Sequence, residues 1–289
     1  MNLLNRHSLI SAIVLISISL LSLKITAEPA DDYEEMKCRK KLKSFDASLK
    51  DLPLNEVIAE VGKSFTGTPY VAGTLDEYPN TEELVINITG LDCVTFVENA
   101  LIFSRLIKSG NADFDNYKKE LELIRYRNGK NSGYSSRLHY FIDWIYDNQK
   151  KGIVKDITSD IGGVNIGKNI DFMTSHRNSY KQLQNNDILL GEMHEVENSI
   201  NSREIFYIPV EDISSVYDKL RTGDIVGITT SIGGLDISHT GFIYKEGGGT
   251  YLMHASLKNK KVEISSSELQ DYIFGNSKQT GIVVARVLE

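Results

Sequence analysis

The chain has 289 residues, of which 41% are hydrophobic and 25% are charged, and it contains only 5 prolines. This composition is typical of a folded globular protein and excludes a disordered or collagen-like chain. The formal net charge of -7 and the isoelectric point near 5.5 argue against nucleic acid as a partner, because phosphate binding needs clustered Lys and Arg.

The N-terminal segment is typical of a secretory signal peptide. Arg6 and His7 precede an apolar run over residues 9–23, and the segment ends at the small residue Ala27. The run has about 15 residues, fewer than the roughly 20 of a membrane-spanning helix, so an uncleaved anchor is the less favoured alternative. We expect residues 1–27 to be removed, which predicts a periplasmic or secreted protein without stable membrane insertion.

The first half of the remaining chain shows helical periodicity. Helices are predicted over residues 32–49, 54–65, 92–110 and 113–125. Between the second and third of them, a segment punctuated by Gly and Pro (67–73) leads to a β-like run over residues 84–89. Cys93 is therefore expected at the start of a buried helix.

From about residue 187 onward the pattern changes to short β-rich runs. Strands are predicted over residues 205–210, 224–231, 239–245, 250–256 and 281–287. His176 and His194 lie in polar stretches without periodic order and are expected to be solvated. Helices followed by antiparallel strands predict an α+β fold, and the absence of repeats or linkers predicts a single domain over residues 28–289.

Cys38 and Cys93 are the two cysteines of the chain. In an exported protein they would ordinarily form a disulfide. The alternative is that Cys93 remains a thiol because it does chemistry. Asp92 is a good N-cap residue, so Cys93 would lie in the first helical turn, at the positive end of the helix dipole. This position predicts a thiol that ionises easily.

His239 and His254 lie on two predicted strands that a glycine-rich loop connects as a hairpin. If Lys245 pairs with Thr250, the two histidines lie diagonally on one face of the sheet. Diagonal Cβ atoms are about 7–8 Å apart, close enough for two imidazoles to meet. A lone histidine on a strand is usually a core residue, but two on one face indicate a site.

Together with Cys93, the histidines fit an order of nucleophile, base and orienting residue. Cys93 would attack, His239 would take and return its proton, and His254 would orient the ring of His239. A metal site built from Cys93, Asp236, His239 and His254 is the competing interpretation. Zinc sites with local ligand pairs usually show tight spacing, which is missing here. We therefore expect neither a metal nor another cofactor.

The sequence resembles the papain-like cell-wall cysteine peptidases and amidases of the NlpC superfamily. The motifs that carry the resemblance, in the order of the family, are Gly67-Thr68-Pro69-Tyr70, Leu91-Asp92-Cys93, Thr222-Gly223-Asp224-Ile225-Val226, Ser238-His239-Thr240-Gly241 and His254-Ala255-Ser256. The resemblance implies a papain-like α+β fold. In that fold the nucleophile begins a buried helix, which packs on the antiparallel sheet that carries the histidines.

More specific motifs are similar to one branch of this superfamily, the N-acetylmuramoyl-L-alanine amidase-like proteins formerly catalogued as a domain of unknown function. These motifs are the segments 91–98, 124–127, 133–140 and 234–239. Val94 follows the nucleophile, where γ-D-glutamyl-diamino acid endopeptidases often have a serine implicated in binding a free L-Ala amine. Its presence favours a substrate whose L-Ala amine is bound in the amide to muramic acid.

The segment over residues 125–140 interleaves basic and aromatic side chains in an otherwise acidic protein. Guanidinium groups could bind the carboxylates of a stem peptide, and tyrosines could stack on a sugar. The alternative is an amphipathic helix with a solvated basic face. With the residues that the family motifs suggest, the predicted substrate-binding set is Tyr70, Asp92, Arg125, Arg127, Tyr134, Arg137, His139 and Asp236.

The resemblance therefore predicts an exported peptidoglycan hydrolase that acts on peptidoglycan or its muropeptide fragments. It would be a cysteine amidase that cleaves the bond between N-acetylmuramic acid and L-Ala through an acyl-enzyme. N-H groups at the helix start, and Tyr70, would stabilise the oxyanion. The alternatives are a γ-D-glutamyl-diamino acid endopeptidase and a catalytically silent muropeptide-binding module.

Overall fold

The computed structural model of the chain describes residues 30–76, 78 and 80–289. The predicted signal peptide lies outside these residues. The helices are α1 (Ala30–Leu42), α2 (Leu54–Lys63), α3 (Cys93–Ser109), α4 (Phe114–Arg125), α5 (Phe141–Lys150), α6 (Phe172–Ser175), α7 (Asp187–Asn201) and α8 (Leu269–Phe274). The strands are β1 (Val154–Asp156), β2 (Val164–Asn165), β3 (Phe206–Pro209), β4 (Ile225–Thr230), β5 (Ile237–Glu246), β6 (Gly249–Ser256), β7 (Lys261–Ile264) and β8 (Gln279–Val287).

The strands form one antiparallel sheet in the order β2-β3-β8-β4-β5-β6-β7, and β1 pairs with β8 beside this path. β5 and β6 form the expected hairpin, in which Lys245 pairs with Thr250 and Phe242 with Met253. The predicted mixed α and β composition, the antiparallel sheet and the hairpin register are therefore confirmed. None of the described helices is long and apolar enough to cross a membrane.

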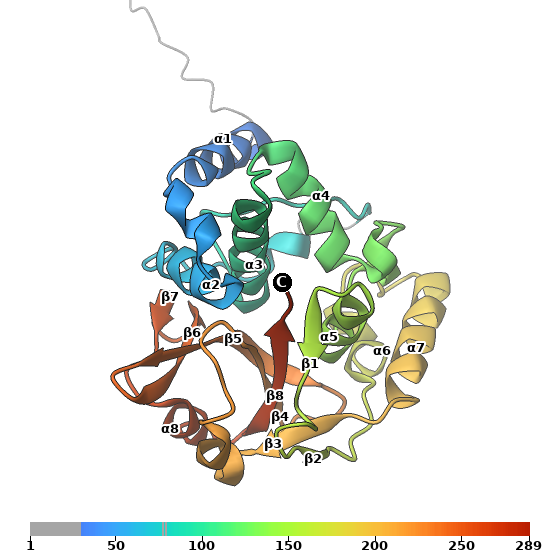
Figure 1. The fold of residues 1–289 in the computed structure, drawn as a ribbon. Helices are drawn as coiled ribbons and strands as arrows, with labels where there is room; N and C mark the ends of the chain where they lie inside the picture. Colours follow the sequence, from blue (N-terminus) through green and yellow to red (C-terminus); the bar gives the residue numbers. More distant parts are fainter. Residues whose placement is uncertain (1–29, 77, 79) are drawn as a thin grey trace, which may run out of the picture.

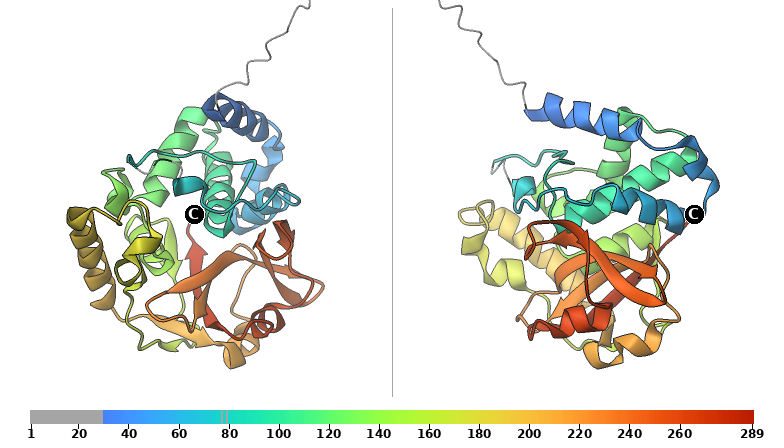
Figure 2. Two further views of the ribbon diagram at one scale, coloured as in Figure 1. Left: turned by 180° about the vertical axis from the view of Figure 1, so that it is seen from behind. Right: turned by 90° about the vertical axis from the view of Figure 1, so that its left-hand side faces the viewer.

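Helices cover both faces of the sheet. Alternate side chains of a strand point to opposite faces, so Ile225 and Phe242 pack with the buried side chains of α2, α3 and α4. Their neighbours Val226 and Ile243 pack on the other face, with Leu269 and the rest of a second cluster. Figure 1 shows α1 to α4 on one side of the sheet and α8 on the other. Both views in Figure 2 place α1 at the end of the helical part that is far from the sheet.

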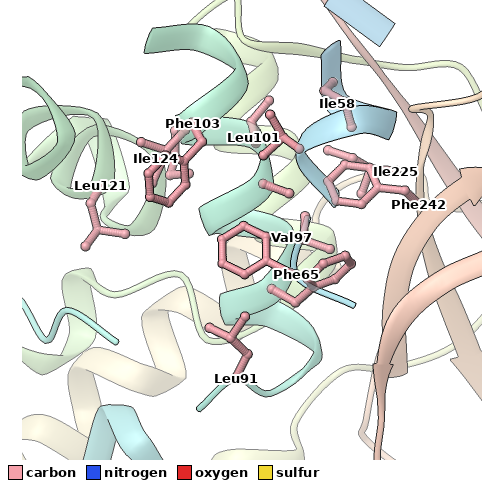
Figure 3. Packing of buried hydrophobic residues seen from close by; sticks show 14 of the residues in the cluster. Ile58, Phe65, Leu91, Val97, Leu101, Phe103, Leu121, Ile124, Ile225 and Phe242 are labelled. Atoms are coloured by element: carbon pink, nitrogen blue, oxygen red, sulfur yellow. The ribbon is translucent and has the colours of Figure 1, made fainter. Parts of the chain in front are cut away.

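Helix α3 is the centre of the larger core, and its side chains from Thr95 to Leu106 are almost all buried. The ring of Phe96 meets that of Phe242 on β5 edge-on, with 5.8 Å between centroids. Phe65, just after α2, packs against Phe96 from another side, with 6.3 Å between centroids. Figure 3 shows this packing around Phe65 and Val97. Each buried Phe contributes roughly 1.5–3 kcal/mol to folding, so these contacts hold the start of α3 against β5.

The predicted β-like run over residues 84–89 is wrong, because this segment forms no strand. Side chains from the helices satisfy its backbone instead of a neighbouring strand. Arg125 donates a hydrogen bond to the carbonyl of Val85 over 2.6 Å, and the N-H of Ile88 donates to Glu34 over 2.7 Å. The apolar alternation of the segment therefore reflects packing against helices and not pairing in a sheet.

The predicted helix over residues 32–49 is broken after Leu42. Asp46 accepts a hydrogen bond from the N-H of Ser48 over 2.8 Å and so starts the short 3-10 helix η1 (Ala47–Asp51). Asp side chains favour such local bonds over a continuous helix.

Helix α7 was not expected, because residues 187–201 were assigned to the β-rich part of the chain. Its buried positions are Met193, Glu197 and Ile200, at helical spacing. Glu197, the middle position, carries a carboxylate that accepts a hydrogen bond from the hydroxyl of Tyr140 over 2.6 Å. This polar residue interrupts the apolar periodicity of the helix. His194 lies on the exposed side of this helix.

Candidate active site

Helix α3 begins at Cys93, as predicted. Asp92 accepts a hydrogen bond from the N-H of Thr95 over 2.8 Å, and the hydroxyl of Thr95 accepts one from the N-H of Asp92 over 2.9 Å. This capping box occupies the side chain of Asp92, one of the predicted substrate-binding residues. Cys38 and Cys93 are both free thiols, so the alternative of a disulfide between them does not apply and Cys93 is available as a thiol. Cys38 is instead a fully buried core residue of α1.

The thiol of Cys93 lies where α3 meets β5. Burial raises its pKa to about 12, and the carboxylate of Asp92 contributes in the same direction. The backbone N-H groups of Thr240, Cys93 and Val94 act against this shift, because they lie beside the sulfur and favour the thiolate. The prediction of an easily ionised thiol is therefore wrong: desolvation outweighs the helix start, and the resting group is a protonated thiol.

The two predicted histidines meet on the sheet. Nε2 of His239 lies 2.7 Å from Nδ1 of His254, and the rings are nearly perpendicular, with 4.8 Å between centroids. Gly241 permits this approach, because a Cβ atom there would lie 2.6 Å from the carbonyl oxygen of Met253 and 3.0 Å from the Cβ of His254. The expected diagonal pair is confirmed.

Both imidazoles are neutral at neutral pH. Burial lowers the pKa of His239 to about 3, and the neighbouring His254 adds to this shift. Burial also lowers the pKa of His254 to about 4. A neutral His239 can accept a proton, and the thiol of Cys93 carries one. The arrangement therefore suits proton transfer to His239 during the attack of the sulfur and not a preformed ion pair.

Tyr70 lies beside the start of α3, in the segment that the family motifs single out. The backbone of Tyr70 forms an isolated parallel β-bridge with Leu91. The N-H of Tyr70 donates a hydrogen bond to the carbonyl of Lys260 over 2.9 Å. Burial raises the pKa of its hydroxyl to about 12, and the neighbouring Cys93 and Asp92 add to this shift. The hydroxyl is thus a protonated donor close to Cys93.

Arg125 does not face a ligand. It is buried, and its guanidinium donates two hydrogen bonds to Glu98 of α3, over 2.9 and 2.7 Å. Its third donor binds the carbonyl of Val85. The expectation that Arg125 binds a stem-peptide carboxylate therefore does not fit its position: Glu98 already supplies that carboxylate from inside the protein.

Arg137, Tyr134 and His139 form one packed group. Arg137 donates to Asp76 over 2.6 Å and to the carbonyl of Leu75 over 3.2 Å, and its guanidinium lies over the ring of Tyr134. A ring nitrogen of His139 lies 2.8 Å from the carbonyl oxygen of Tyr134. Burial, and then Arg137, hold the pKa of His139 well below its usual range. These side chains hold the segment over residues 74–76, and their predicted contact with substrate finds no support.

Arg127 and Asp236 both stabilise helix α5. Arg127 makes a 2.7 Å ion pair with the buried Asp143. Asp236 accepts a hydrogen bond from the N-H of Ile142 over 2.9 Å, in the first turn of the helix. Burial raises the pKa of Asp236 to about 6, against the effect of the helix-start N-H groups. Both side chains therefore have structural partners in helix α5, and their predicted role in substrate binding finds no support.

A pocket of about 840 Å³ borders His239 and extends along β6, β7 and α8. Its volume is within the range of small-molecule sites. Residues that line it, besides His239, include Ser238, Lys258, Glu263, Asp271 and Tyr272. Within the part of the chain that the structure describes, no three His, Cys, Asp or Glu side chains converge as a metal site would require.

Two residues near the histidines were missed by sequence reasoning. Glu263 pairs with His254 across β6 and β7, and the ring of Tyr272 stands edge-on to His254 with 5.1 Å between centroids. The strand β7 has four residues, too few for periodicity to reveal it. Its register depends on the turn before it, where Lys260 adopts a φ of 57°.

The two imidazoles should make the folding stability depend on pH. Because their pKa values fall from 6.5 to about 3 and about 4 on folding, the unfolded chain binds more protons than the folded chain below pH 6.5. Above about pH 6.5 both imidazoles are neutral in the folded and the unfolded chain, so the free energy of unfolding is not reduced by them. As the pH falls below this value, the free energy of unfolding decreases by up to about 1.4 kcal/mol per histidine and pH unit. Urea denaturation at pH 7 and pH 5 measures this loss.

The control for this prediction is the double variant His239→Gln/His254→Gln, which should lose less stability than the unmodified protein between the two pH values. The raised pKa of Asp236 acts in the opposite direction, because its folded form keeps a proton up to about pH 6. That effect is present in both proteins and cancels in the comparison. An equal loss in the two proteins would contradict the assignment of neutral, buried imidazoles.

Comparisons with known proteins agree with the motifs. The model of the AmiA-like family, described as N-acetylmuramoyl-L-alanine amidase-like, matches residues 60–282. An N-acetylmuramoyl-L-alanine amidase from Bacteroides uniformis is a similar solved structure: it is 35% identical with a TM-score of 0.76, over 82% of this chain and 99% of that chain. A Legionella pneumophila protein is 25% identical with a TM-score of 0.67, over 90% and 96% of the two chains.

A further similar structure, from Bacteroides fragilis, is named as a candidate xylanase; it is 34% identical with a TM-score of 0.74, over 79% of this chain and 100% of that chain. No curated protein matches the sequence. The matched segment of the family model contains Tyr70, Cys93 and both histidines of the pair. This chain belongs to the AmiA-like family of N-acetylmuramoyl-L-alanine amidase-like proteins.

Proposed function

We propose that the protein is an exported cysteine amidase with a papain-like, NlpC-type site, which hydrolyses the bond between N-acetylmuramic acid and L-Ala in peptidoglycan or its fragments. The observation that carries the proposal is the 2.7 Å pair of His239 and His254 on the sheet that packs against the start of α3, in a chain of this family. Export rests on the signal-like segment over residues 1–27.

In the proposed reaction, the sulfur of Cys93 attacks the lactoyl carbonyl carbon of the muramic acid. The thiol proton moves to His239 as the carbon-sulfur bond forms. His239 then donates this proton to the L-Ala nitrogen as the carbon-nitrogen bond breaks, which leaves a thioester. Water, deprotonated by His239, hydrolyses the thioester and restores the thiol. His254 orients the ring of His239 throughout.

The negative charge on the carbonyl oxygen needs donors in the tetrahedral intermediate. The N-H groups of Cys93 and Val94 are suited to this role, because they already lie beside the sulfur at the start of α3. The N-H of Thr95 is bonded to Asp92 and is not available. The protonated hydroxyl of Tyr70 is a third candidate donor.

Val94 supports the amidase over the endopeptidase alternative. Its side chain packs against the main hydrophobic core, so the site has no hydroxyl at this position to bind the free amine of an L-Ala terminus. A substrate whose L-Ala nitrogen is already part of the muramoyl amide needs no such donor or acceptor.

Product analysis tests the proposal. Incubated with a disaccharide-tetrapeptide, the enzyme should release an intact peptide that begins with L-Ala together with a peptide-free disaccharide, as measured by mass spectrometry. Free L-Ala-D-Glu peptides should be poor substrates, because they lack the scissile amide. Release of the diamino acid portion, with L-Ala-D-Glu still on the sugar, would support the endopeptidase. Binding without any product would support the silent module.

The two histidines should differ in their effect on turnover. His239→Ala should reduce kcat by about 10⁴-fold or more, because it removes the base, whereas His254→Ala should leave measurable activity, because it removes only the orienting residue. Initial rates on the same muropeptide measure both effects. An equal loss in both variants would contradict the assigned roles. Loss of activity with EDTA and recovery with zinc would replace the triad by a metal site.

The name of the Bacteroides fragilis structure raises a second candidate, a glycoside hydrolase. Most such enzymes use a pair of carboxyl groups that flank the glycosidic bond. The side chains paired at this site are two imidazoles, on the sheet that packs against the helix start with Cys93, which suits acyl transfer instead. Xylo-oligosaccharides are therefore a useful negative control in the product assay, and their hydrolysis would contradict the amidase proposal.

A further inference from the structure

His254 carries one ring nitrogen whose role the catalytic scheme does not explain. Its Nδ1 meets His239, but its Nε2 is buried and has no hydrogen-bond partner among the described residues. His254 as a whole has no exposed surface. A buried polar group without a partner lowers the stability of the fold, so we expect a nearby group that interacts with this nitrogen.

Glu263 is placed to interact with this nitrogen. Its Oε1 atom lies 4.0 Å from Nε2 of His254, and the two residues are cross-strand partners of β6 and β7. The same oxygen accepts a hydrogen bond from the side chain of Asn259 over 2.6 Å, which holds the carboxylate beside the ring. The separation of 4.0 Å exceeds a hydrogen bond, but a charge at this distance still acts on the buried ring.

The protons of the two imidazoles must be distributed in one way for the proposed reaction. If Nδ1 of His239 accepts the proton of Cys93, then Nε2 of His239 must carry a hydrogen and donate it to Nδ1 of His254. That nitrogen must then be free of hydrogen, which places the remaining proton of His254 on Nε2. This is the nitrogen that faces the carboxylate of Glu263.

We propose that Glu263 is a positioning residue that keeps the proton of His254 on Nε2 and thereby leaves His239 in the tautomer that can act as a base. A negative charge near Nε2 attracts the N-H dipole and disfavours the tautomer with hydrogen on Nδ1. This inference rests on the proposed function only for its effect on turnover. The tautomer itself is a property of the folded protein.

The other elements that pack against His254 do not supply this charge. β5 contributes the neutral His239, and α8 contributes the edge-on ring of Tyr272. Burial raises the pKa of Tyr272 to about 12, so its hydroxyl is uncharged at neutral pH. Among the described residues that pack against His254, the charged group is therefore the carboxylate of Glu263 on β7.

The test uses the full mature chain and the variants Glu263→Gln, which removes the charge, and Glu263→Leu, which also removes the acceptor. We expect kcat on the muropeptide to fall by about 10-fold in the first and by about 10- to 100-fold in the second, by analogy with partners that orient ligating histidines. KM should change little. A large rise in KM with an unchanged kcat would overturn the proposal and make Glu263 a substrate contact in the neighbouring pocket.

A double-mutant cycle separates positioning from a merely structural role. In a His254→Ala background, Glu263→Leu should cause no further fall in kcat, because the residue through which it acts is missing. A full, additive loss in that background would overturn the proposal. Glu268→Gln is the matched control, since it removes a carboxylate that binds the N-H of Thr250 on the same strand as His254, and it should leave kcat unchanged.

Nitrogen NMR of the histidine rings tests the tautomer without any substrate. In the unmodified protein, Nε2 of His254 should give the signal of a protonated nitrogen and Nδ1 that of an unprotonated one, and Glu263→Leu should shift the population toward hydrogen on Nδ1. An unchanged ring spectrum in the variant would overturn the proposal. Because this measurement needs no turnover, a failure of the amidase function and a failure of the role of Glu263 are distinguishable.

Discussion

Replacing Cys93 with alanine should abolish hydrolysis, with a fall in kcat of about 10⁴-fold or more, because no other group can form the thioester. The fold should survive, since the capping box between Asp92 and Thr95 does not involve the thiol. Turnover of disaccharide-tetrapeptide and circular dichroism spectra of the variant check the two parts of this result.

Cys38→Ala is the matched control for the nucleophile. Cys38 is fully buried in the core under α1, so its loss should lower the stability slightly and leave kcat unchanged. Loss of activity in both variants, with a disulfide between the two cysteines seen by mass spectrometry, would remove Cys93 from the role of nucleophile. Alkylation of the native protein with iodoacetamide should modify Cys93 slowly, because its thiol is protonated at rest, and should spare Cys38, which has no exposed surface.

The largest effect on stability is expected at the ion pair between Arg125 and Glu98. Both side chains are buried, and the pair joins the end of α4 to the middle of α3. Glu98→Ala should lower the free energy of unfolding by about 3–5 kcal/mol, because it leaves a buried guanidinium without a counter-charge. Urea denaturation measures the change.

The double variant Glu98→Leu/Arg125→Met is the control, because replacing both partners of a buried pair with apolar residues costs much less than removing one. It should recover most of the stability. If the double variant also keeps its KM for muropeptide, Arg125 does not bind the substrate. A Glu98→Ala protein as stable as the unmodified one would contradict the role of the pair, as would a fall in stability that the double variant does not reverse.

The sequence was sufficient to predict the structural features that depend only on neighbouring residues. Asp92 and Gly110 bound α3 by capping and by a left-handed φ of 72°, and both depend only on nearby residues. The glycine-rich loop sets the hairpin register, and the register brings His239 and His254 together. The helix start with its thiol and the histidine pair could therefore be predicted without a structure.

Other features depend on partners that are distant in the sequence. Whether Arg125 is solvated or buried depends on Glu98, 27 residues away, and the contact of Arg137 with Asp76 spans 61 residues. The composition of residues 125–140 is typical of a binding surface, whereas the three arginines of this segment pair with carboxylates of the protein itself. No pattern within the segment could have distinguished these two cases.

By itself, the sequence determined which residues begin α3, which strands form the hairpin and which family the chain resembles, because capping, turn chemistry and side-chain alternation act over a few residues. Only the tertiary structure decided the protonation states of Cys93 and the histidines, since these follow from desolvation by elements that meet only in the folded chain. The same holds for Glu263, whose place beside His254 is set by the pairing of β7 with β6.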